Sequence, residues 1–75
     1  MVELKNRLKF FRFQHNVITQ EELAEQVGVT RQTILAIEKG KFNPSMKLAL
    51  QIARALGARV DEIFFLEGDE DDQKS

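Results

Sequence analysis

The 75-residue chain has no cysteine, no tryptophan, no tyrosine, and only one proline and one histidine. Without cysteine it can form neither a disulfide framework, nor a thiolate metal site, nor a cysteine nucleophile. His15 alone cannot build a His-rich metal site or a Ser-His-Asp triad, and we expect it to be an exposed loop residue. No apolar run approaches the roughly 20 residues that span a bilayer, and no signal peptide is evident. These absences predict a cytoplasmic domain that is not an enzyme and has no metal, cofactor or membrane partner.

The length allows one domain and little else. A chain this short buries only about 60% of its extended surface, so a partner subunit is a reasonable expectation. We expect no room for a small-molecule pocket. Apolar residues make up 43% of the chain and charged residues 31%, which is typical of a globular protein.

The net charge of −1 conceals an uneven distribution. Residues 1–59 contain ten basic and five acidic residues, a net charge of +5, whereas residues 60–75 contain one lysine and seven acidic residues, a net charge of −6. A basic body suits a polyanionic partner. Residues 68–75 are expected to be a disordered tail that increases solubility. Alternatively, this acidic tail competes with the polyanionic partner for binding to the basic residues 1–59.

Apolar spacing and capping residues predict five short helices. Leu4, Leu8 and Phe11 indicate a first helix over residues 4–13. The capping box Thr19-Gln20-Glu21-Glu22 opens a second helix, which Gly28 ends. The third helix is expected between the cap Thr30 and Gly40, the fourth between Ser45 and Gly57, and the fifth from about residue 61.

The expected fold is therefore all-α, with one domain over residues 1–67. A short two-stranded sheet, pairing residues 1–4 with residues 64–67, is the only β structure that we expect. The inward-facing residues of the second to fourth helices form the expected core: Leu23, Ala24, Val27, Ile34, Ile37, Leu48, Ala49, Ile52, Ala53 and Leu56.

Two short helices joined by a turn that contains glycine describe a helix-turn-helix. Residues 20–39, QEELAEQVGVTRQTILAIEK, closely resemble this motif in the lambda-repressor-like Cro/CI family, also called the XRE family. The family pattern requires a small residue, a glycine and five apolar residues at set positions. All seven are met: Ala24, Gly28, Leu23, Val27, Val29, Ile34 and Ile37. The resemblance covers about residues 4–66 and implies a five-helix, DNA-binding regulator of transcription.

The resemblance also implies which residues meet DNA. The third helix, about residues 30–38, would lie in the major groove. Its expected base contacts are Thr30, Arg31, Gln32, Thr33 and Ala36, with Ala36 favoured over Leu35. Arginine can bridge guanine O6 and N7, and glutamine can bridge adenine N6 and N7.

Contacts to phosphate are implied around the motif, where they would position the protein and make binding salt-dependent. The expected phosphate contacts are Asn6, Arg7, Gln20, Lys39, Lys41, Asn43 and Ser45. Arg12 and Glu38 match family positions that form a structural ion pair. The segment from residue 14 to 18 is about one residue longer than usual, which is the main departure from the family.

The C-terminal apolar residues Ile63, Phe64, Phe65 and Leu66 exceed what five short helices can bury. We therefore expect a symmetric homodimer built on them, which the resemblance also implies. Phe10 and Phe13 are equally hard to bury and suit a chain terminus or a second subunit. The resulting hypothesis is a homodimeric regulator, more specifically a repressor, that binds a pseudo-palindromic operator.

Two alternatives keep the same DNA-binding domain. One is an antitoxin-type regulator that also binds a protein partner. The other is the controller protein of a restriction–modification system. An enzyme is the weakest alternative, since Glu21, Glu22 and Glu25 are explained by a solvated helix face with N-terminal capping.

Overall fold

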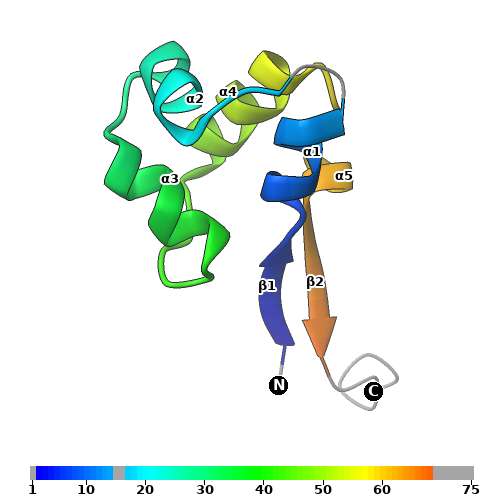
Figure 1. Ribbon diagram of the computed structural model, residues 1–75. Helices are drawn as coiled ribbons and strands as arrows, with labels where there is room; N and C mark the ends of the chain where they lie inside the picture. Colours follow the sequence, from blue (N-terminus) through cyan, green and yellow to red (C-terminus); the bar gives the residue numbers. More distant parts are fainter. Residues whose placement is uncertain (1, 15–16, 69–75) are drawn as a thin grey trace.

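The computed structural model describes residues 2–14 and 17–68. In chain order the elements are β1 (Val2–Asn6), α1 (Leu8–Gln14), α2 (Gln20–Val27), α3 (Arg31–Glu38), α4 (Met46–Leu56), α5 (Val60–Ile63) and β2 (Phe64–Gly68). The helices form a body from which the two strands project side by side (Figure 1). The predicted helical fold with a small sheet from the two chain ends is confirmed. No helix in the described residues combines the length and apolar character needed to cross a membrane.

Side-chain caps and left-handed glycines set the helix ends at the expected places. The Thr19 hydroxyl accepts a hydrogen bond from the Glu22 amide (3.0 Å), and the Glu22 carboxylate accepts one from the Thr19 amide (2.8 Å). Gly28 ends α2 with a φ of 77°, a conformation that costs other residues free energy. Thr30 and Ser45 cap α3 and α4. These local signals correctly located the helix-turn-helix.

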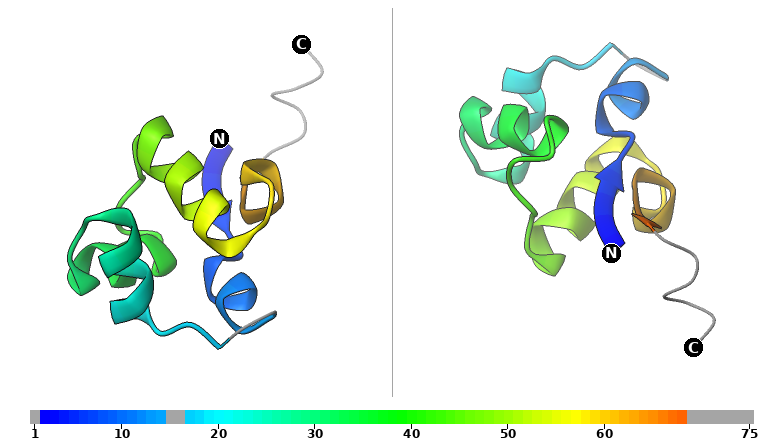
Figure 2. Two further views of the ribbon diagram at one scale, coloured as in Figure 1. Left: turned by 90° about the horizontal axis from the view of Figure 1, so that it is seen from above. Right: turned by 90° about the horizontal axis from the view of Figure 1, so that it is seen from below.

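One apolar core joins all five helices. Every residue of the predicted core is buried, and Leu8, Ile63 and Phe64 are buried with them. The small side chain of Ala24 is only 3% exposed, on a helix that packs against both α3 and α4. Viewed from above and below, α4 lies between the α2–α3 pair and α5 (Figure 2). This arrangement leaves the outer side of α3 exposed to solvent.

The N-terminal segment differs from the prediction. Leu4 does not belong to a helix but to β1, where it faces Leu66 in an antiparallel sheet that pairs Val2 with Gly68 and Asn6 with Phe64. The helix starts later because the Asn6 side-chain carbonyl accepts a hydrogen bond from the Leu8 amide (3.1 Å). Both strands are longer than expected, and β2 includes Gly68, which we had assigned to the tail.

The C-terminal apolar residues separate into two groups. Ile63 is fully buried and Phe64 nearly so, both in the core of the single chain, and their assignment to a dimer interface is therefore wrong. Phe65 is half-buried beneath the Arg7 guanidinium, which lies 4.8 Å from the ring centroid. Leu66 is 67% exposed. The predictions for His15 and for residues 69–75 lie outside the described residues.

Candidate nucleic-acid interface

Helix α3 has one buried and one exposed side. Ile34 and Ile37 point into the core and are at most 1% exposed. Arg31 and Gln32, in the first turn, are exposed to solvent. Thr30 caps the helix, and its hydroxyl accepts a hydrogen bond from the Thr33 amide (3.3 Å). Burial of the two isoleucines therefore fixes which side of α3 faces solvent and can contact a partner.

The expected base-contact residues lie in the N-terminal two turns of α3 and its cap. Thr30 is exposed like Arg31 and Gln32, whereas Thr33 and Ala36 are half-buried. The Thr30 and Thr33 hydroxyls lie 3.2 Å apart, so one of them donates to the other. Leu35 is half-buried like Ala36, so burial does not distinguish these two candidates. Their contact with bases remains a prediction.

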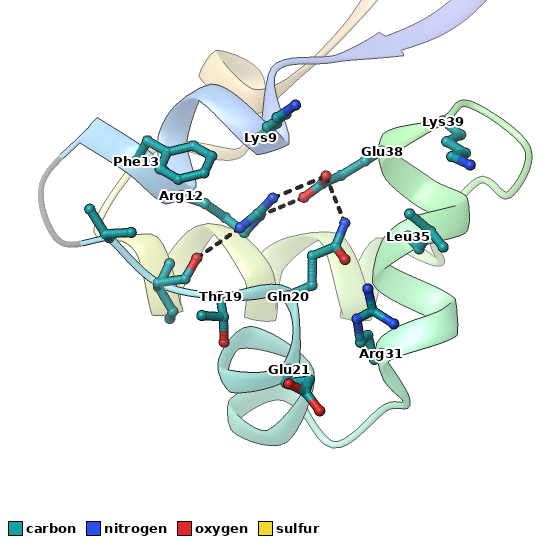
Figure 3. Close-up of a pocket in the computed structure, with 12 residues that line it drawn as sticks. Lys9, Arg12, Phe13, Thr19, Gln20, Glu21, Arg31, Leu35, Glu38 and Lys39 are labelled. Atoms are coloured by element: carbon teal, nitrogen blue, oxygen red, sulfur yellow. Dashed lines mark hydrogen bonds and ion pairs between the residues drawn. The ribbon is translucent and has the colours of Figure 1, made fainter.

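Arg12 and Glu38 form a bidentate ion pair between α1 and the end of α3 (Figure 3). The Arg12 Nε donates to Glu38 Oε2 at 2.6 Å and Nη2 donates to Oε1 at 3.2 Å. Their side chains are only 6% and 9% exposed. Arg12 Nη1 also donates to the Ile18 carbonyl (2.9 Å), so each guanidinium nitrogen has a partner. The pair therefore connects α1, the segment before α2 and the end of α3.

Gln20 takes part in this network. Its side-chain Nε2 donates to Glu38 Oε1 at 3.1 Å, and the residue is half-buried. We had expected Gln20 to contact phosphate, and no periodicity in the sequence relates it to Glu38. The structure shows that this hydrogen bond joins the first turn of α2 to the last turn of α3, and the contact of Gln20 with phosphate remains a prediction.

Asn6 has a comparable role. Its side-chain amide donates to the Ile37 carbonyl (2.8 Å) near the C-terminus of α3, while its carbonyl caps α1. The structure thus assigns Asn6 to holding α3, a role that the sequence did not indicate. The contact of Asn6 with phosphate remains a prediction.

The other expected phosphate contacts remain on the surface. Arg7, Lys39, Lys41, Asn43 and Ser45 are all exposed. The Ser45 hydroxyl accepts a hydrogen bond from the Leu48 amide (3.1 Å), which orients the first turn of α4. Lys39 and Lys41 follow α3 directly and supply positive charge at its C-terminal end. Their contact with phosphate remains a prediction.

A hollow of about 610 Å³ lies between α1 and α3, next to the buried ion pair (Figure 3). Lys9, Arg31 and Lys39 contribute to its lining, together with the side chains of Phe13 and Leu35. This hollow is open to solvent, so the expectation that so short a chain has no room for a small-molecule pocket stays a prediction. In residues 2–14 and 17–68 no group of three or more acidic or histidine side chains could hold a metal ion.

Comparison with known proteins finds the same kind of domain. The helix-turn-helix family matches residues 16–63. An uncharacterised HTH-type transcriptional regulator of Methanocaldococcus jannaschii is 55% identical over 67 residues, which are 89% of this chain and all of that protein. The HTH-type transcriptional regulator YgzD of Bacillus subtilis is 47% identical over 64 residues, 85% of this chain and 96% of that protein. The crystal structure of the hypothetical transcription factor NHTF from Neisseria has a TM-score of 0.66 at 31% identity, covering 73% of this chain and 62% of that one.

Proposed function

Because the chain belongs to the helix-turn-helix family of DNA-binding transcriptional regulators, we propose that it binds a pseudo-palindromic operator as a homodimer and represses transcription from it. The observation that carries this proposal is the exposed N-terminal half of α3. Arg31 and Gln32 have long, exposed side chains there. The opposite side of the helix is buried in the core, and its C-terminal end is held by the ion pair of Glu38 with Arg12. That is the arrangement needed to read base edges from the major groove.

Base recognition would rest on Arg31 and Gln32. Their donors and acceptors match guanine and adenine respectively, and Thr30 and Thr33 add hydroxyls at the same end of the helix. Ala36, one turn further on, is small enough to contact a thymine methyl group. Arg7, Lys39, Lys41 and Asn43 would bind phosphate, which would fix the register without specifying sequence.

Dimerisation would involve the sheet. An isolated two-stranded sheet is marginally stable in water, and within the part of the chain that the structure describes β1 and β2 pair only with each other. Leu66 is exposed on β2, and Phe65 is half-buried beside it. A second copy packed on these residues would cover apolar surface and place two recognition helices for adjacent half-sites about 34 Å apart. Transcription would be repressed because the bound dimer occupies the operator. We expect the protein to act in the cytoplasm.

Selection from a random duplex library at moderate salt tests the proposal. We expect enrichment of an inverted repeat whose half-sites are about 10 base pairs apart, one turn of B-DNA. A single enriched half-site would contradict the dimer while keeping sequence-specific binding. If no sequence is enriched and binding disappears with added salt, only phosphates are contacted and the proposed operator recognition is wrong.

The dimer is tested by Leu66→Asp. We expect this variant to sediment as a monomer while the unaltered protein sediments as a dimer, because a carboxylate on each copy would be buried near its counterpart. Since Leu66 is exposed in the single chain, the fold itself should be little affected. Val17→Asp is the matched control, because Val17 is 71% exposed and does not belong to either strand. Equal dimerisation of both variants would exclude the sheet as the interface.

A further inference from the structure

Three positively charged side chains contribute to the lining of the hollow between α1 and α3. Lys9 comes from α1, and Arg31 and Lys39 come from the beginning and the end of the α3 region (Figure 3). Lys9 lies outside the helix-turn-helix motif, and nothing in the sequence connects it with the other two. Only the packing of α1 against the rest of the domain brings these charges to one site.

The positive charge of this site is largely uncompensated. Six charged residues line the hollow: Lys9, Arg12, Arg31, Lys39, Glu21 and Glu38. Arg12 and Glu38 neutralise each other in their buried pair. In residues 2–14 and 17–68, none of Lys9, Arg31 and Lys39 has a carboxylate within 4.0 Å. Besides the neutral pair, the lining therefore has three positive charges and one negative charge, that of Glu21. This net positive charge favours binding of an anion.

The uncharged part of the lining, which is apolar except for Thr19 and Gln20, indicates what kind of anion would bind. Phe13, Val17 and Leu35 are apolar and line the same hollow. An inorganic phosphate ion would occupy a small part of about 610 Å³ and would leave these walls in water. A sugar–phosphate strand suits the site better, because its phosphates can meet the lysines while a deoxyribose packs against the apolar side chains. Arg31, the expected base contact, borders the same hollow, so such a strand would be continuous with the DNA that α3 reads.

We propose that Lys9 is a DNA-phosphate contact and that the hollow between α1 and α3 receives the sugar–phosphate backbone of one strand. This inference rests on the proposed function and extends the DNA-binding surface to α1. Arg12 and Glu38 contribute by holding α1 and α3 at a fixed separation. Lys9 would then approach the backbone from α1, and Lys39 from the residue that directly follows α3.

The test is the affinity of Lys9→Gln for a short fluorescein-labelled duplex of random sequence, measured over a series of KCl concentrations. Loss of one phosphate contact should reduce the salt slope of log K by about 0.9 and weaken binding roughly five- to tenfold near 0.1 M salt. Lys9→Arg should keep both values close to those of the unaltered protein. Arg54→Gln is the matched control, since Arg54 is an exposed cation that borders a separate hollow on α4.

Each outcome separates the explanations. If Lys9→Gln behaves like Arg54→Gln in affinity and slope, Lys9 does not bind the duplex and the inference is overturned. If inorganic phosphate alone perturbs the Lys9 resonances while the duplex slope is unchanged in Lys9→Gln, the site binds a free anion and the inference is again wrong. If the unaltered protein fails to bind any duplex, the proposed function is overturned together with it. Circular dichroism should show a folded Lys9→Gln, because the residue is exposed.

Discussion

Arg12→Ala should destabilise the domain by about 3–5 kcal/mol, because it leaves the Glu38 carboxylate buried without its cation. Both side chains are more than nine-tenths buried, and the pair is bidentate. A loss of this size is a large share of the roughly 5–15 kcal/mol that stabilises a typical domain. We therefore expect a folded but much less stable protein, with a markedly lower midpoint of urea unfolding.

Urea unfolding followed by circular dichroism would measure this loss. Arg59→Ala is the surface control: the Arg59–Asp61 pair is mostly exposed, so its removal should change stability by less than about 1 kcal/mol. The double variant Arg12→Met/Glu38→Leu should recover much of the loss, since apolar residues of similar volume often replace a buried ion pair without penalty. Equal effects of Arg12→Ala and Arg59→Ala would show that the buried pair does not support the fold.

Arg31→Ala and Gln32→Ala should each reduce affinity for the selected operator by about 1–3 kcal/mol, or roughly five- to 150-fold. Both residues are exposed, so the loss should come from recognition and not from folding. More diagnostically, each substitution should relax the base preference at one position in each half-site. Repeating the duplex selection with each variant would measure that preference directly.

Lys41→Ala is the control for this experiment. Lys41 lies in the loop after α3 and is expected to contact phosphate, so its loss should weaken binding to all sequences about equally and reduce the salt slope by about one. Base preferences that are unchanged in Arg31→Ala and Gln32→Ala would place sequence recognition elsewhere on the domain.

The local features of this protein could be predicted from its sequence alone. Thr19, Thr30 and Ser45 cap their helices, and Gly28 and Gly57 end theirs, because each signal acts over three or four residues. The helical spacing of apolar residues likewise identified the core of α2, α3 and α4. The first helix was misjudged at Leu4, whose spacing suits a helix but whose partner across the sheet is Leu66. The sequence also predicted a sheet that includes residue 4, but apolar spacing could not show that Leu4 belongs to that sheet and not to the helix.

The order and ends of most helices, the helix-turn-helix and the exposed face of its second helix could be predicted from the amino-acid sequence, because these follow from contacts between near neighbours. Tertiary structure alone decided the rest. It placed Asn6 on the Ile37 carbonyl and Gln20 on Glu38, and it buried Ile63 and Phe64 inside one chain. It also brought Lys9 to the hollow beside Arg31. These contacts join residues that are far apart in the chain. Many polar or apolar residues could form such contacts, and the packing of the helices decides which of them come together.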